Sequence, residues 1–288
     1  MQHKSKAKRR DIITSTLDAV TEDQIREFLA KEMKNNKELF NKFVAIFGTK
    51  QRYKTNYRAM VKSMYAKHKK VYGVLPCGAR LDFDKIVELA RAHENRKDYG
   101  EAIRAYKELS EVIAENMDNV DDSGAEFSTW FSMTIDDMIE CINKQGGAKE
   151  QYITYMVERF VLNEPDFFGE DYKDALNALC TTAGELVHWE KLLDSHMPDI
   201  IPDKYKDFIK YDIAIRIVKM KITVLEKTKS PELINTFAKY YRYDFDICTS
   251  YIVKLQRNKK IQEARHITKE RAKLFPNDVS KLRALPKI

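Results

Sequence analysis

Two consecutive stretches of the chain, 99–118 and 122–143, carry apolar side chains at every third or fourth position. This spacing collects the apolar side chains on one face of an α-helix, whereas a half-buried strand would need strict alternation. Turn-forming residues at 118–124 separate the two stretches, and a shorter helical pattern at 83–95 precedes them. We therefore expect a long helical hairpin with a lead-in helix. Ser123 and Glu126 have the spacing of a capping box, which predicts Ser123 as the N-cap of the second helix.

Both stripes are wide enough to pack on two neighbouring helices, as a bundle or a solenoid requires. They consist of Ala102, Ala105, Tyr106, Leu109, Val112 and Ile113 in the first helix and Phe127, Trp130, Phe131, Ile135, Met138, Ile139 and Ile142 in the second.

The rest of the chain also favours helices, because only 9 Gly and 7 Pro interrupt 288 residues. Thr21 and Gln24 have capping-box spacing before an amphipathic segment. Similar patterns continue to a final pair at 244–257 and 260–274, before Pro276. We predict an all-α fold, an irregular α-α superhelix of about 12 to 14 helices. Its expected parts are a basic arm at 1–20, a basic helical part at 21–72 and a helical-repeat part at 73–288, the last two either separate or continuous.

Charge is distributed unevenly along the chain. Residues 1–80 carry a net charge of +12, residues 81–200 carry −16 and residues 201–288 carry +11. A basic–acidic–basic chain can neutralise itself if its ends approach its middle, or it can offer separate basic and acidic faces to partners. The acidic centre favours a basic partner.

Basic residues alternate with tyrosines near the N-terminus. Cations contact phosphates and aromatic rings stack on bases, so this part of the chain is a candidate nucleic-acid surface. The alternative is a solvated helix face. The candidate contacts are Lys8, Arg9, Arg10, Arg52, Tyr53, Lys54 and Arg58.

Two segments resemble tetratricopeptide repeats. The run from Lys97 to Tyr106, with the small residue Ala102, is similar to the turn and second helix of that repeat. Residues 251–278 have the same outline, but the ~34-residue period is not kept between the two segments. The resemblance implies a degenerate, TPR-like superhelix with a groove for a partner. The candidate groove residues are Tyr99, Tyr106, Trp130, Phe167 and Phe168.

A second resemblance covers most of the chain. The segments 38–43, 98–102 and 120–124 look like the helical region found downstream of SWIM-type zinc fingers in microbial proteins. The C-x-C and C-x-H motifs of the finger itself are absent from this sequence. The resemblance therefore implies a fold, and it carries over neither zinc ligands nor a nucleic-acid role.

Two E-x-x-H motifs, Glu185 to His188 and Glu263 to His266, have the spacing that di-iron bundles use. Glu263 and His266 are expected on the solvent side of their helix, so chance spacing is the simpler explanation.

Gly73 and Gly78 form half of a phosphate loop, without the Lys-Ser/Thr that completes it. We expect an inter-helix loop there and no cofactor.

The four cysteines, Cys77, Cys141, Cys180 and Cys248, lie far apart and are expected to be free thiols in a reducing compartment. No apolar run approaches the ~20 residues of a membrane span, so we expect a cytoplasmic protein.

Three hypotheses follow. The first is a non-enzymatic scaffold that binds a protein or peptide partner, the second a nucleic-acid-associated accessory protein that uses the two basic regions, and the third a metalloenzyme.

Overall fold

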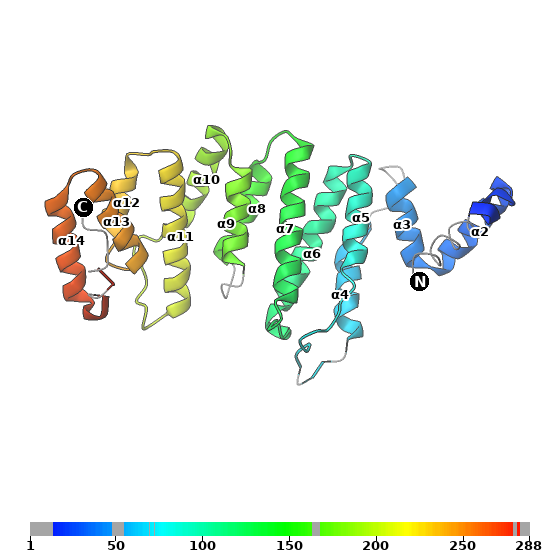
Figure 1. Ribbon diagram of the computed structural model, residues 1–288, viewed down its shortest axis with the longest axis horizontal. Helices are drawn as coiled ribbons and strands as arrows, with labels where there is room; N and C mark the ends of the chain where they lie inside the picture. Colours follow the sequence, from blue (N-terminus) through cyan, green and yellow to red (C-terminus); the bar gives the residue numbers. More distant parts are fainter. Residues whose placement is uncertain are drawn as a thin grey trace, which may run out of the picture.

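The structure is a computed structural model that describes residues 14–47, 55–68, 70–71, 73–162, 168–278 and 281–282. Its α-helices are drawn out along one axis, with α2 near one end and α14 near the other (Figure 1). They are α2 (Glu22–Asn35), α3 (Lys37–Phe47), α4 (Tyr57–Lys67), α5 (Asp84–Asn95), α6 (Tyr99–Asn116), α7 (Glu126–Gln145), α8 (Glu150–Leu162), α9 (Gly169–Leu179), α10 (Ala183–His196), α11 (Phe208–Lys227), α12 (Glu232–Tyr240), α13 (Phe245–Arg257) and α14 (Ile261–Leu274).

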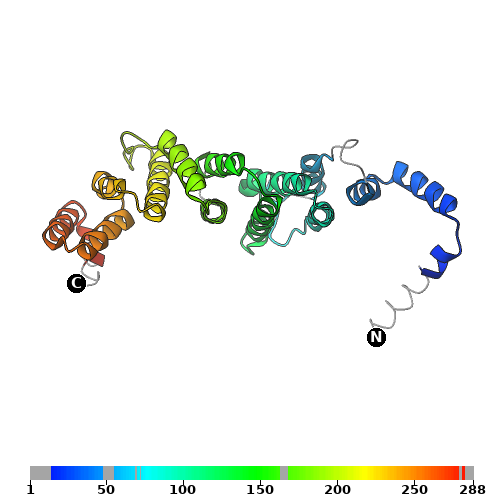
Figure 2. The same cartoon turned by 90° about the horizontal axis from the view of Figure 1, so that it is seen from above.

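The all-α helical-repeat fold predicted from the sequence is confirmed. Each helix packs mainly on its neighbours in the chain or on the next helix but one, and the stack forms a shallow arc when it is seen from above (Figure 2). Two short 3₁₀ helices, Met117–Asn119 and Pro276–Asp278, follow α6 and α14. Within the described ranges, β-structure is limited to isolated bridges, Val71 with Val74 and Leu75 with Val120.

The hairpin of α6 and α7 is the most extensive helix contact in the stack. The apolar stripe predicted for each helix is buried, except that Trp130 stays half-buried beside Phe83. The predicted capping box at Ser123 is wrong. Oδ1 of Asp122 accepts the backbone N–H of Phe127 at 2.7 Å, and its Oδ2 accepts that of Ser128 at 3.1 Å. Because Ala125 adopts a left-handed conformation, with φ at 54°, the chain turns so that Asp122 reaches the start of α7.

Two apolar cores succeed one another along the stack. The first extends from α4 to α11, and the second from Ile201 to Leu282. The buried residues of α4, Tyr57, Val61 and Tyr65, belong to the first core. The change of core therefore falls at α11.

Helix α11 joins the cores because it is apolar on opposite faces. Ile217, Met220 and Val224 pack into the first core, whereas Ile215, Val218 and other residues pack into the second.

At the other end of the stack, the predicted capping box of Thr21 and Gln24 is confirmed. Helix α2 nevertheless has no buried residue, so it is held less firmly than the helices of the two cores.

Candidate functional site

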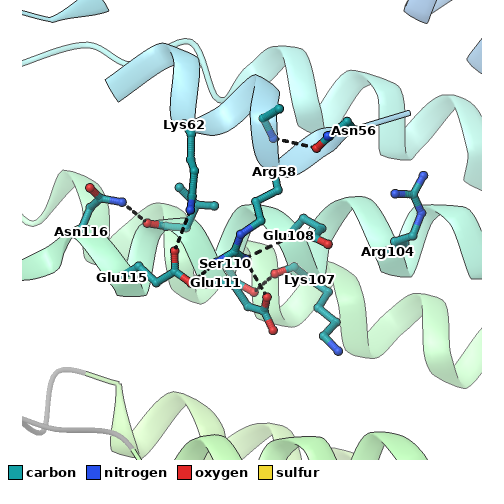
Figure 3. A network of polar contacts seen from close by, with 12 residues as sticks. Asn56, Arg58, Lys62, Arg104, Lys107, Glu108, Ser110, Glu111, Glu115 and Asn116 are labelled. Carbon is teal, nitrogen blue, oxygen red and sulfur yellow. Dashed lines mark hydrogen bonds and ion pairs between the residues drawn. The ribbon is translucent and has the colours of Figure 1, made fainter. Parts of the chain in front are cut away.

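Arg58, a predicted nucleic-acid contact, points from α4 into a row of carboxylates on α6 (Figure 3). Its Nη1 atom lies 3.4 Å from Oε2 of Glu108 and 3.1 Å from Oε2 of Glu111, and its Nη2 atom donates to Glu115. Arg159 of α8 approaches Glu111 from the other side at 2.8 Å. A basic residue of the N-terminal part therefore pairs with acidic residues of the centre at a partly exposed contact, and Arg58 fixes α4 on α6.

The other predicted nucleic-acid contacts lie outside the described residues. They are Lys8, Arg9, Arg10, Arg52, Tyr53 and Lys54.

Two of the predicted groove residues, Tyr106 and Phe168, are buried in the first core. Tyr106 is fully buried and its hydroxyl donates to Oε1 of Glu94 at 2.6 Å, so it is a core residue. Phe168 is also buried, and its ring stacks on Phe131 with a centroid distance of 3.7 Å. Tyr99 and Trp130 are half-buried against the first core, and Phe167 lies outside the described residues. Tyr106 and Phe168 therefore fill space between helices.

The E-x-x-H motifs serve the architecture. Glu185 forms a capping box with Thr182, and its Oε2 also accepts the N–H of Thr181 at 2.8 Å. His188 pairs with the hydroxyl of Thr154 at 3.1 Å. In the second motif, Oε1 of Glu263 accepts the hydroxyl of Tyr251, and His266 is exposed.

No group of three His, Cys, Asp or Glu side chains able to hold a metal ion occurs among the described residues. Of the helices in the described ranges, none is both long and apolar enough to cross a membrane.

A groove beside the N-terminal half of α11 brings several helices together. It consists of two adjoining cavities of about 390 Å³ and 610 Å³, which share Lys204, Tyr211 and Asp244. We call it the α11 groove. Its walls come from Phe160 of α8, Gly169 and Lys173 of α9, Phe208 to Thr223 of α11, Asp244 and Phe245 at the start of α13, and Arg271 and Phe275 at the end of α14.

Local sequence explains how the walls are placed. Asp207 caps α11 by accepting the N–H of Lys210, and Asp244 caps α13 by accepting those of Asp246 and Ile247. Both helices therefore begin at the groove. The hydroxyl of Tyr211 donates to the backbone oxygen of Tyr243, which ties the two starts together.

Arg271 forms the deep end of the groove. Its side chain is buried, with Nη1 donating to the oxygen of Arg242 at 2.7 Å and Nε donating to Oδ2 of Asp278 at 2.9 Å. The guanidinium carbon lies 3.8 Å from the ring centroid of Phe275. A buried guanidinium held on three sides is rigid, so this wall is preorganised.

Lys219 lies between two carboxylates, 3.1 Å from Oδ1 of Asp244 and 2.8 Å from Oδ2 of Asp246. Burial works to lower the pKa of Lys219, but its bonds to Asp246 and Asp244 outweigh burial and raise the pKa above its ordinary value. Arg216 similarly lies 2.9 Å from Asp212. Positive and negative groups alternate along the walls, so the groove has little net charge.

Large apolar side chains stand open to solvent at the mouth of the groove. Tyr205 is 95% exposed and Phe208 is 61% exposed. Clusters of exposed apolar side chains of this kind mark surfaces that bind other molecules. In the sequence, the apolar residues beside Pro198 and Pro202 are the signal that could have pointed to this surface.

Comparisons of the chain with protein-family models, curated proteins and solved structures found no match.

Proposed function

We propose that this protein is a non-enzymatic scaffold that binds a segment of a partner protein in the α11 groove. The observation that carries the proposal is that α9, α11 and α13, alternate helices of the stack, contribute walls to one groove bordered by exposed aromatic side chains. Helical-repeat proteins use surfaces formed by successive repeats to bind extended partners, and the stack is proposed to be TPR-like in this respect.

The chemistry of the walls favours a partner with apolar anchors. Tyr205 and Phe208 offer apolar area that is now exposed to water, and burying such area is the main favourable term in association. The carboxylates and cations inside the groove already neutralise one another, as Lys219 with Asp244 illustrates. Recognition by aromatic and aliphatic side chains, with polar groups fixing the orientation, is therefore the proposed mode.

The test is a selection of displayed random peptides against the full chain, followed by fluorescence anisotropy with the enriched peptides. Phe208→Asp and Tyr205→Asp place charges on exposed side chains at the mouth of the groove. We expect each to weaken binding by about tenfold or more, because a charge opposes burial of the anchor. The methyl group of Met220, which lines the groove, should change its NMR shift when a peptide binds.

Val187→Asp is the matched control, since Val187 is 45% exposed on α10 and does not line the groove. It should leave the affinity unchanged. Failure to enrich any peptide, or equal binding by Phe208→Asp, would refute the proposal. A gel shift on mixed DNA and RNA at low salt tests the nucleic-acid alternative, and strong binding there without any peptide binding would replace the scaffold by that function.

A further inference from the structure

A second hollow lies at the opposite end of the stack, between α3 and α4. It comprises cavities of about 450 Å³ and 210 Å³ that share Lys37, Asn41 and Met60. We call it the α3–α4 cleft. Helix α3 packs mainly on α5 and α2, so the two cavities occupy the space where α3 and α4 face each other.

The floor of the cleft is apolar and deformable. Met60 and Met64 are half-buried on α4 and line the larger cavity with Ala59, and Val44 lines the smaller one. Methionine side chains are flexible and polarisable, which suits them to surfaces that accept apolar side chains of different shapes. The floor can therefore take an aliphatic or thioether anchor.

The rim is cationic, because its two acids are already paired. Nζ of Lys85 lies 3.0 Å from Oε2 of Glu38 and 3.0 Å from Oδ2 of Asp82. No ion pair joins Lys67 or Arg80 to an acidic residue within the described ranges. The 43 residues between Glu38 and Asp82 contain ten Lys or Arg and no Asp or Glu. Of these ten, Lys42, Arg58 and Lys62 pair with carboxylates of α5 and α6.

Asn41 provides a polar group inside the cleft. Its side chain is 8% exposed, and its Nδ2 atom donates to the thioether sulfur of Met60 at 3.4 Å. A thioether is a weak acceptor, so a carbonyl oxygen of a bound chain would be a better partner for this buried amide. The cleft thus combines an apolar floor, a cationic rim and a buried amide donor.

We propose that the α3–α4 cleft binds an acidic segment of a partner protein, with an apolar side chain inserted over Met60 and Met64 and carboxylates at Lys67 and Arg80. Charge complementarity with the rim selects the acidic partner. A peptide fits these features better than a nucleic acid, because bases stack on aromatic faces and, among the described residues, no Tyr, Phe or Trp lines the larger cavity and only Phe40 lines the smaller one. This site is separate from the α11 groove and does not depend on it.

The experiment uses the full chain labelled with ¹³C at the methionine methyl groups and a displayed library of random twelve-residue peptides. We expect the selection to enrich acidic peptides with one Leu, Met or Phe. Binding should shift the methyl signals of Met60 and Met64 and leave that of Met220 in the α11 groove unchanged. This pattern separates the two sites, so either proposal can fail alone.

Variants complete the test. Lys67→Glu, on the rim, and Ala59→Trp, which fills the cleft from an exposed position, should each weaken binding by about tenfold or more. Lys70→Glu makes the same charge change on an exposed residue outside the cleft and should leave the affinity within about twofold. Circular dichroism confirms that the variants are folded.

Three results would overturn the proposal. One is a selection without enrichment of acidic peptides. Another is equal weakening by Lys70→Glu and Lys67→Glu, which would indicate general attraction to a basic surface. The third is a shift of Met60 and Met64 by single-stranded RNA of mixed sequence at lower concentration than by any peptide, which would assign the cleft to nucleic acid.

Discussion

The Nζ atom of Lys221 in α11 donates to Oε1 of Glu190 in α10 at 3.0 Å. The lysine side chain is 3% exposed and also lies 2.7 Å from Oδ1 of Asp194. It therefore makes a largely buried ion pair on the helix that is shared by the two apolar cores. Since removing one partner of such a pair leaves the other desolvated and uncompensated, this contact stabilises the junction of α10 and α11.

Lys221→Ala should lower the free energy of unfolding by about 2 to 4 kcal/mol, because Glu190 would stay half-buried without its cation. Urea unfolding followed by circular dichroism measures the change. Lys191→Ala, at an exposed position of α10, should change stability by less than about 0.5 kcal/mol. Equal stability of Lys221→Ala and the parent chain would show that packing alone joins the cores.

Asp122→Ala should destabilise the protein by about 1 kcal/mol, because the backbone N–H groups of Phe127 and Ser128 would lose their acceptor. Ser123→Ala should change stability by less than about 0.5 kcal/mol, although the sequence pattern marks Ser123 as the cap. Thermal or urea unfolding of the two variants distinguishes the two caps. A larger loss for Ser123→Ala than for Asp122→Ala would restore the capping box expected from the sequence.

Glu185 makes the junction of α9 and α10 sensitive to acid. Burial alone would raise the pKa of Glu185, but hydrogen bonds from Thr182 and Thr181, together with Lys149, hold it at about 2. The pKa is lower in the folded chain than its ordinary value, so the stabilisation is present above about pH 4.5 and is lost as the pH falls toward 2.

Glu185→Gln should therefore cost about 1 to 2 kcal/mol at pH 7 and little at pH 2. Urea unfolding of both chains across this pH range gives the comparison. An unchanged difference between the chains at pH 7 and pH 2 would mean that ionisation of Glu185 contributes nothing to stability.

A single cysteine should react with a thiol reagent in the folded protein. Cys77 is exposed, whereas Cys141, Cys180 and Cys248 are buried. Burial raises the pKa of Cys141 and Cys180 to about 12 and that of Cys248 to about 11. The thiolate is the reactive form, so raising the pH from 7 to 9 should not add reactive thiols.

Titration with a coloured disulfide reagent should count one thiol per chain before unfolding and four in urea. Cys77→Ser should leave none in the folded state. Rapid reaction of further thiols in that variant would indicate that a core opens readily.

The helices were predictable to within a few residues because their signals are local. The apolar spacing from Ala102 to Ile113 and the capping box at Thr21 lie within single turns or single helices, and both appear as expected. The prediction for the cap of α7 failed because Ala125 adopts a left-handed conformation, which brings Asp122 to the first backbone N–H groups of the helix. An alanine does not predict that conformation.

The candidate sites were much less predictable. Tyr106 and Phe168 look like binding residues in the sequence, but their exposure depends on helices that pack over them. The residues that line the α11 groove come from positions more than one hundred residues apart in the chain, such as Phe160 and Phe275. No local pattern links such positions.

By itself, the sequence determined an all-α stack, its main apolar faces and its basic–acidic–basic order, because helix formation and net charge are set by neighbouring residues and by composition. Only the tertiary structure decided that Arg58 is held by Glu108, Glu111 and Glu115. It also decided that the core changes at α11 and that open hollows remain beside α11 and between α3 and α4. These features depend on distances between residues far apart in the chain, which packing fixes and sequence order does not.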